Sequence, residues 1–307
     1  MEISEIEMHL IEKYYQQVNR KSKLPSNCLI HLCDGHLHHG GLADRLRGIV
    51  SAYRFCKETH RPFRIGFFEP FDLREYFLPN LYDWNVEKSD IIYDLSLSIP
   101  KVIRCITENN DELCLHRKRF YSDVKSEVRQ IHLYSNSLCF INEFQNDFNE
   151  LFRPSSNLCI ELKKIESCLG NDYESVSLRF GNWLGDFPDI FNPLTLDKQV
   201  ILLNQVNELL ERLANSVYKR GNKLLVTSDS QRFISQIGTI PNTFLICGPI
   251  VHSNNSKDEG GIMKVFLEFM TISQAKSIWS ISTKEMYKGS FAKIAALSKG
   301  KLCNQYE

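Results

Sequence analysis

The segment Leu32–Gly48 reads LCDGHLHHGGLADRLRG and joins a short apolar strand to a glycine turn and then to an arginine-bearing helix. Gly40 and Gly41 allow a tight turn that brings the backbone close to a ligand, and the start of the following helix directs free N–H groups to the same place. Arg45 and Arg47 add positive charge there. The segment therefore predicts an anion-binding turn, although a plain strand-to-helix connection with solvated arginines fits the same pattern.

The composition is that of an ordinary globular protein. The chain has 307 residues, of which 43% are hydrophobic, so it is long enough for two domains with cores of their own. Its 37 basic and 37 acidic residues cancel, which argues against a general attraction to nucleic acid or to an anionic membrane. We expect a cytoplasmic protein, because neither a signal peptide nor a membrane-spanning run is evident, and we expect its 10 cysteines to be reduced.

The first half of the sequence predicts an α/β layer. Strands are expected at Cys28–Cys33 and Phe63–Phe68, with weaker candidates at Ile91–Ile99 and Gln130–Tyr134. The pattern breaks at Arg153–Asn157, where a proline and two serines interrupt it. We therefore predict two α/β domains, residues 1–155 and residues 156–307.

The second half alternates strands with helices, a rhythm that is typical of a parallel sheet covered on both faces. The strands are expected at Ser175–Phe180, Lys223–Thr227, Thr243–Cys247 and Lys276–Ser282, and the helices at Leu194–Tyr218, Gln231–Ile237, Gly261–Gln274 and Lys284–Ser298. The long helix carries one apolar stripe, which consists of Leu196, Val200, Leu203, Val206, Leu210 and Leu213.

Polar loops follow two of these strands. Arg179 closes the first strand, and ligands of open α/β sheets bind beyond the carboxyl ends of strands. Its guanidinium could form two parallel hydrogen bonds to a phosphate, with a surface ion pair as the alternative. After the second strand, Asp229 could bind ribose hydroxyls, whereas Ser228 or Ser230 could simply cap the next helix.

A third polar segment follows the last predicted strand. Gly289, Ser290 and Phe291 fall where the start of a helix could contact a phosphate. Three alanines follow within the same helix, so a face of small residues that packs closely is the alternative.

His36, His38 and His39 form the histidine cluster of the sequence. The arrangement HLHH lacks the i, i+4 spacing of a helical metal pair, and a metal would need further ligands from Asp34, Asp44 or elsewhere. We favour a role for one imidazole, or for a nearby carboxylate, as a general base that acts on a hydroxyl. The plain alternative is that these histidines only line the loop.

Taken in order, four segments resemble the fucosyltransferase superfamily. HGGLADRLR at 39–47 resembles the glycine motif of the N-terminal domain, and VSLRFGN at 176–182 resembles the first motif of the C-terminal domain, commonly His-x-Arg-x-Gly-Asp. VTSDS at 226–230 resembles the next strand-end motif, and GSFA at 289–292 resembles the terminal segment that holds nucleotide phosphates. Ser177 and Asp44 depart from the histidine and asparagine that many members carry at these positions.

The resemblance implies a GT-B-like α/β fold, in which two Rossmann-like domains face each other across a cleft. Residues 1–155 would be the acceptor-side domain with the glycine-rich loop, and residues 156–307 the nucleotide-sugar-binding domain. The implied activity is that of an inverting, metal-independent glycosyltransferase that uses GDP-fucose, and no cofactor is expected. The absence of an Asp-x-Asp motif agrees with this.

The resemblance also implies the roles of particular residues. The donor would be bound by Gly40, Gly41, Arg45, Arg179, Ser228, Asp229, Ser290 and Phe291. Arg179 would contact the pyrophosphate. The base would be Asp44, one of the clustered histidines such as His39, or Asp186, for which capping of a loop is the alternative role.

Two other functions stay open. A catalytically inert protein of the same fold would bind a nucleotide or a glycan and keep Arg179, whereas a metal-dependent hydrolase would use His36, His38 and His39. We expect the transferase to work in the cytoplasm, where it could also associate peripherally with the inner face of the membrane. This location predicts a lipid-linked oligosaccharide of an O-antigen or capsule as the acceptor. Five aromatic residues are expected in the core or at an interface, and an aromatic platform for the acceptor is the alternative: Phe67, Phe68, Tyr76, Phe77 and Trp84. Nucleic acid is not an expected partner.

Overall fold

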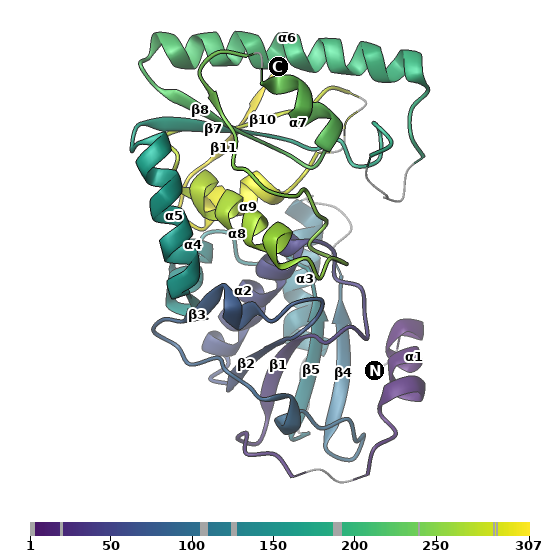
Figure 1. Ribbon diagram of the computed structural model, residues 1–307. Helices are drawn as coiled ribbons and strands as arrows, with labels where there is room; N and C mark the ends of the chain where they lie inside the picture. The colour runs from purple at the N-terminus through teal and green to yellow at the C-terminus, as the bar shows by residue number, and fades with distance from the viewer. Residues whose placement is uncertain are drawn as a thin grey trace. The chain divides into compact units, whose positions relative to one another are not determined.

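The computed structural model describes residues 4–18, 21–104, 110–123, 128–186, 192–238, 240–284, 286 and 288–307. The chain divides into two compact units, Met1–Ser155 (unit 1) and Ser156–Glu307 (unit 2), and each is built around a parallel sheet (Figure 1). Within the described residues, no helix is long and apolar enough to span a bilayer.

Unit 1 holds a four-stranded sheet in the order β2-β1-β5-β4, in which all neighbours are parallel. Its strands are β1 (Cys28–Cys33), β2 (Phe63–Phe67), β4 (Ser98–Ile103) and β5 (Gln130–Ser135). Helices α1 (Glu5–Tyr14), α2 (Leu42–Glu58), α3 (Asn110–Asp123) and α4 (Phe144–Leu151) complete the unit, with 3-10 turns at Leu73–Glu75 and Lys88–Asp90. A small antiparallel pair joins β3 (Phe77–Pro79) to β6 (Phe152–Pro154).

Both faces of the unit-1 sheet are covered, which explains why all residues of β1 are buried. Alternate residues Cys28, Ile30 and Leu32 join a core cluster with residues of α1, including Leu10. His31 lies on the opposite face, where α2 approaches so closely that a Cβ on Gly48 would overlap the backbone oxygen of Ser135. The sheet is therefore buried on both sides, as parallel sheets usually are.

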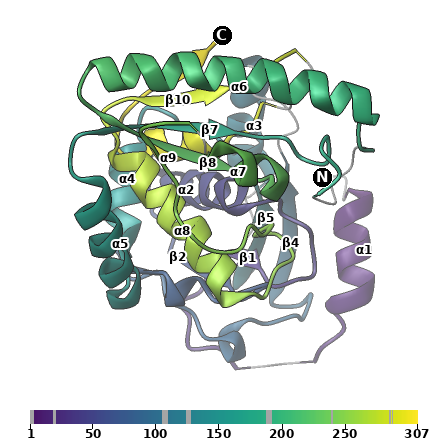
Figure 2. The same cartoon turned by 45° about the horizontal axis from the view of Figure 1, so that its top comes forward.

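Unit 2 holds a five-stranded parallel sheet in the order β11-β10-β7-β8-β9. Its strands are β7 (Tyr173–Leu178), β8 (Lys223–Ser228), β9 (Thr243–Phe244), β10 (Ile278–Ile281) and β11 (Cys303–Tyr306). Its helices are α5 (Ser156–Leu169), α6 (Leu196–Lys219), α7 (Gln231–Ile237), α8 (Glu259–Gln274) and α9 (Phe291–Leu297). Figure 2 shows the sheet of this unit between α6 on one side and the pair α8 and α9 on the other.

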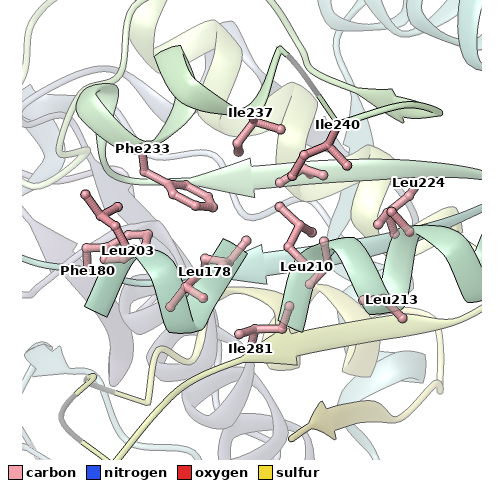
Figure 3. Close-up of a cluster of buried hydrophobic side chains, with 14 of the residues drawn as sticks. Leu178, Phe180, Leu203, Leu210, Leu213, Leu224, Phe233, Ile237, Ile240 and Ile281 are labelled. Carbon is pink, nitrogen blue, oxygen red and sulfur yellow. The ribbon is translucent and has the colours of Figure 1, made fainter. Parts of the chain in front are cut away.

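The core between α6, α7 and the sheet is apolar throughout (Figure 3). Leu203, Leu210 and Leu213 of α6 lie in it together with Phe233 of α7 and Leu178 of β7. The predicted stripe of α6 is wrong at its first two positions, because Leu196 and Val200 are exposed. These residues belong to the first turns of the helix, before the part that packs on the sheet.

Most predicted elements are present, and the differences lie at irregular segments. The weak strand candidate Ile91–Ile99 is wrong, because β4 begins at Ser98 and residues 91–97 form an irregular connection. The predicted helix Lys284–Ser298 is shorter, because α9 begins at Phe291; positions 285 and 287 lie outside the described residues. Strand β11 was not predicted, since its sequence Cys-Asn-Gln-Tyr has almost no apolar pattern.

Candidate functional site

The carboxyl ends of β7 and β8 are joined by the side chain of Asp229. Its Oδ1 accepts a hydrogen bond from the backbone N–H of Phe180 at 2.8 Å, and its Oδ2 accepts one from Gly181 at 2.9 Å. Strand β7 ends at Leu178, so both amides belong to the loop that follows it. Asp229 thus holds the loop after β7 in one conformation.

Arg179 lies beside this carboxylate, with its guanidinium Nη1 3.3 Å from Asp229 Oδ2. About 30% of the Arg179 side chain is exposed, compared with 14% for Asp229. Burial raises the pKa of Asp229, and the charge of Arg179 together with the two amides opposes that rise. The pair therefore presents a partly accessible guanidinium on a buried, hydrogen-bonded support, which suits an anionic ligand.

The segment before α9 contacts the same arginine. A Cβ on Gly289 would lie 3.1 Å from Cβ and 3.3 Å from Cγ of Arg179, so the glycine allows this close approach. Ser290 precedes α9 and makes no capping hydrogen bond through its side chain. Phe291 packs its ring against Phe269 of α8, with ring centroids 5.8 Å apart. Gly289 is thus brought to Arg179, while the ring of Phe291 is used in packing.

Two other predicted residues have structural partners at this edge. Asp186 Oδ2 accepts hydrogen bonds from Ser230 Oγ at 2.8 Å and from the backbone N–H of Arg232 at 2.7 Å, so it binds the first turn of α7. Ser228 is buried, and its Oγ accepts a hydrogen bond from the backbone N–H of Ser230 at 3.2 Å. Asp186 therefore has the capping role that was its alternative, and donor binding by Ser228 stays a prediction.

An ion pair that the sequence analysis missed lies on α8. Lys264 Nζ is 3.2 Å from Glu268 Oε1, and both side chains are largely buried. Burial raises the pKa of Glu268 to about 7; Lys264 opposes this rise, and the negative charge of Asp229 adds to it. The negative charge of Asp229 thus acts on Glu268. The signal in the sequence was a Lys and a Glu at i, i+4 spacing in an otherwise apolar helix.

The glycine turn of unit 1 is organised by Asp44. Its Oδ2 accepts a hydrogen bond from the backbone N–H of Gly41 at 3.2 Å, and its Oδ1 lies 2.9 Å from Nη2 of Arg47. Gly40 has φ +83° and touches the Asp44 carboxyl group, so a side chain at position 40 would clash with it. A carboxylate therefore already occupies the N-terminus of α2, where the sequence predicted an anion.

The arginines of this turn are buried rather than solvated. Arg45 is only 3% exposed, and it donates hydrogen bonds to the carbonyl oxygens of Gly40 at 3.1 Å and Glu69 at 2.6 Å. Its guanidinium also stacks over Phe67 at 4.8 Å. Arg47 donates to the carbonyl oxygen of Asn136 at 2.5 Å. Both arginines thus connect loops through hydrogen bonds to carbonyl oxygens. A role of Arg45 in donor binding stays a prediction.

The three clustered histidines have different surroundings. His36 Nδ1 lies 3.1 Å from Asp34 Oδ2, whereas His39 is buried and stacks on Tyr134 with ring centroids 5.7 Å apart. His38 is exposed. Burial lowers the pKa of His39 well below its usual value, so this imidazole stays neutral near pH 7. In the described part of the chain, no three His, Cys, Asp or Glu side chains gather in the geometry of a metal site.

No protein-family model and no curated protein matches this sequence. Solved structures do match in fold. A fucosyltransferase NodZ from Bradyrhizobium superposes with a TM-score of 0.56 at 14% identity, covering 89% of this chain and 92% of that one. An Arabidopsis thaliana FUT1 variant in complex with GDP has a TM-score of 0.53 at 10% identity, covering 98% and 74%. A POFUT1 in complex with GDP-fucose has a TM-score of 0.51 at 12% identity, covering 92% and 98%.

These likenesses define the architecture. The chain has the α/β fold of the GT-B fucosyltransferases, with one parallel sheet in each of its two units, and the fold class predicted from the sequence is confirmed. At such low identity the likeness concerns the fold, and the function must be argued from the site.

Proposed function

We propose that this chain is a glycosyltransferase that binds a nucleoside-diphosphate sugar, GDP-fucose before others, at the carboxyl edge of the unit-2 sheet. The observation that carries the proposal is the Arg179 guanidinium on the Asp229 carboxylate, with Gly289 against the arginine side chain. Three loops that follow β7, β8 and β10 thus meet at one accessible positive charge. The NodZ and POFUT1 structures of the same fold include complexes with GDP or GDP-fucose, which supports the choice of donor.

The donor site must stabilise the negative charge that develops on the leaving group. Departure of GDP places negative charge on the bridging oxygen, and a guanidinium held in position stabilises this charge without moving at the moment of reaction. Asp229 fixes the loop after β7 through Phe180 and Gly181, so Arg179 is oriented before the donor binds. This arrangement requires no metal ion, and we propose metal-independent transfer with inversion at the anomeric carbon.

A base must take the proton of the attacking hydroxyl. The candidate bases are Asp44, Asp186 and the clustered histidines His36, His38 and His39. Of these, His39 is almost fully buried, and Asp186 binds the first turn of α7. Asp44 keeps 29% of its side chain exposed and carries a carboxylate that can accept a proton. We therefore propose Asp44 as the base of the transfer reaction, although its carboxylate is also held by Gly41 and Arg47.

The proposed acceptor rests on the cytoplasmic location that we propose for this protein. A transferase that works in the cytoplasm, at the inner face of the membrane, meets surface glycans as lipid-linked precursors. We propose a hydroxyl group of such an oligosaccharide, in O-antigen or capsule synthesis, as the acceptor.

The first test is calorimetric binding of GDP, UDP, CDP and dTDP, with and without EDTA. We expect selective GDP binding that EDTA does not change and that weakens in Arg179→Ala by about 1.5–3 kcal/mol, because a charge-assisted hydrogen bond is lost. Arg220→Ala is the matched control, since this arginine pairs with Glu174 near the opposite end of β7. Binding of none of the four nucleotides would refute the proposal, and tight binding of another nucleotide would change the donor.

A second assay separates the transferase from an inert protein of the same fold. Incubation with GDP-fucose and a mixture of lipid-linked oligosaccharides should release GDP, and Asp44→Asn should abolish this release while GDP still binds. GDP binding without release of GDP by the wild type would favour the inert binder. Release that Asp44→Asn leaves unchanged would assign the base to another residue.

A further inference from the structure

Unit 1 contains a pocket of about 440 Å³ that no step of the proposed donor chemistry uses. It lies where the end of α1 meets the loops after β1 and β2, and its lining includes Tyr14, His36, Phe68 and Tyr93. Pockets of this size accept small organic ligands, usually through aromatic walls and a few fixed polar groups. All lining residues belong to unit 1, so the pocket is complete within one compact unit.

The aromatic wall of the pocket is rigid. The rings of Tyr14 and His36 stack with centroids 3.7 Å apart and an interplanar angle of 8°. Tyr93 meets His36 edge to face at 5.1 Å. Because α1 carries Tyr14 and the loop after β1 carries His36, two separate elements hold the wall in place. A ligand therefore meets an arrangement that needs little ordering on binding.

Asp34 is the centre of the polar network at the pocket. Its Oδ2 accepts hydrogen bonds from Tyr93 at 2.7 Å and from Tyr134 at 2.8 Å, and it lies 3.1 Å from His36 Nδ1. Burial favours the protonated acid, but the hydrogen bond and charge of His36 and the hydrogen bond from Tyr93 lower the pKa of Asp34 to about 2. The ionised carboxylate can only accept, so it faces His36 Nδ1 as an acceptor at 3.1 Å.

The contact with Asp34 is made through Nδ1, which leaves the second ring nitrogen of His36, Nε2, for a ligand. His36 Nε2 forms no hydrogen bond to any residue that the structure describes, and about 24% of the side chain is exposed. An imidazole Nε2 without a proton accepts a hydrogen bond from a hydroxyl group, and a protonated Nε2 donates one to a hydroxyl oxygen. The Asp34–His36 pair thus supplies one oriented polar atom, His36 Nε2, at the wall of the pocket.

The charges around the pocket favour a neutral ligand. Lys13 and Lys88 lie at its rim, and each ammonium group sits over an aromatic ring, Tyr14 at 5.1 Å and Phe68 at 5.2 Å respectively. Two acidic residues, Asp34 and Glu69, line the same space. The two carboxylates balance the two ammonium groups, and a hydroxyl group can both donate and accept a hydrogen bond in such surroundings.

We propose that this pocket binds a neutral saccharide unit, with the sugar against the Tyr14–His36 wall and one hydroxyl group hydrogen-bonded to His36 Nε2. Under the proposed function this unit belongs to the acceptor, and in that respect the assignment rests on the transferase activity. The binding itself does not depend on the donor, because the pocket is lined by unit 1 alone.

The test uses the full-length protein and a glycan array of neutral mono- to hexasaccharides without added nucleotide. At least one glycan should bind, and its affinity should fall tenfold or more in Tyr14→Ala and in His36→Ala. Tyr218→Ala is the matched control, because Tyr218 is an exposed tyrosine of α6 in unit 2. Urea unfolding of the same samples shows whether each variant is folded, and calorimetry with GDP shows whether the donor site is intact.

A spectroscopic readout tests the assigned contact directly. In protein labelled with ¹⁵N at histidine, the bound glycan should shift the Nε2 resonance of His36 more than its Nδ1 resonance. Absence of binding to every glycan, or unchanged binding in both pocket variants, would overturn the assignment. Glycan binding without GDP binding would support the pocket assignment and refute the donor proposal. GDP binding without glycan binding would support the donor proposal and refute the pocket assignment.

Discussion

At the scale of single residues, charged side chains in this protein work mainly by holding loops. Arg45 binds the carbonyl oxygens of two loops, Arg47 binds a third, and Asp229 binds two consecutive amides. Each of these groups is buried or nearly so, where an unmade hydrogen bond costs about 1–3 kcal/mol. Arg45, Arg47 and Asp229 therefore have structural roles at the loops that follow the strands. Beside Asp229, Arg179 adds an accessible guanidinium.

The change Asp229→Asn should separate the positioning role from simple charge. An amide side chain has one oxygen, so one of the N–H groups of Phe180 and Gly181 would face an NH₂ group. We expect a loss of about 1–3 kcal/mol in the free energy of unfolding and at least a tenfold loss of GDP affinity. Urea unfolding and calorimetry measure the two quantities.

Asp258→Asn is the matched control for this change. Asp258 caps α8 by accepting hydrogen bonds from Gly260 and Gly261, and asparagine caps helices equally well. This control should leave both quantities almost unchanged. Wild-type GDP affinity in Asp229→Asn would show that the loop after β7 does not need the carboxylate.

The Lys264–Glu268 pair should make donor affinity depend on pH. Since the pKa of Glu268 is raised to about 7, its negative charge develops between pH 6 and pH 8, close enough to Asp229 to interact with it. This charge opposes a diphosphate, so GDP affinity should fall about threefold across that range in the wild type and less in Glu268→Gln. Calorimetry at pH 6, 7 and 8 compares the two proteins. Parallel curves would show that Glu268 does not act on the donor.

At the scale of elements, the close approach of α2 to β5 decides the packing of unit 1. Gly48 lies against the carbonyl group of Ser135, and His31 Nε2 is 2.9 Å from the same oxygen. No side chain fits between the helix and the strand at this point. The helix that carries Asp44 and Arg45 is thereby held against the centre of the sheet, which places the glycine turn.

Gly48→Ala should destabilise unit 1 even though alanine favours helices. The added methyl group would meet backbone atoms, which cannot move aside as a flexible side chain can. We expect a loss of about 2–4 kcal/mol in the free energy of unfolding, which exceeds the helix-propensity gain of about 1 kcal/mol. Urea unfolding measures this change.

Gly238→Ala provides the comparison, because open space surrounds that glycine and its φ is −54°. The same substitution there should be neutral within about 0.5 kcal/mol. Equal effects of the two substitutions would mean that α2 can shift away from β5 at little cost.

At the scale of the whole molecule, buried histidines predict sensitivity to acid. Burial lowers the pKa of His31 to about 4 and that of His132 to about 3, with Ser135 and Asp34 opposing the respective shifts. The folded chain therefore keeps these imidazoles neutral, whereas the unfolded chain takes up protons near pH 6.5. Their contribution to stability is complete above pH 6.5 and is lost as the pH falls toward 4.

The variant His31→Gln should reduce this dependence on pH. Each proton that only the unfolded chain binds adds a slope of about 1.4 kcal/mol per pH unit, and glutamine keeps a donor for the carbonyl oxygen of Ser135. We would measure urea unfolding between pH 6 and pH 4.5, with hydrogen exchange in unit 1 as the readout. The free energy of unfolding should change less steeply with pH in the variant than in the wild type. The exposed His9→Gln serves as the control. A slope equal to that of the wild type would mean that His31 is protonated in the folded chain.

Local sequence determined the regular elements and the fold class. Apolar runs and glycine turns marked β1, the start of α2 and the βα alternation of unit 2, because burial of one face imposes a period along the chain. The same patterns placed Arg179 and Asp229 after neighbouring strands of a parallel sheet, so their proximity could be expected. The irregular segment before β4 and the polar strand β11 carry no such pattern, and they were missed.

Only the tertiary structure decided what the charged and aromatic residues do. Asp34, Tyr93 and Tyr134 are far apart in the sequence, as are Tyr14 and His36, and no local period links them. The sequence allowed solvated arginines in the glycine turn. In the structure Arg45 and Arg47 are buried, because carbonyl oxygens of distant loops accept their hydrogen bonds. A pattern along the chain reports which face of an element is buried, whereas the partner of a buried polar group comes from another element, and folding alone brings the two together.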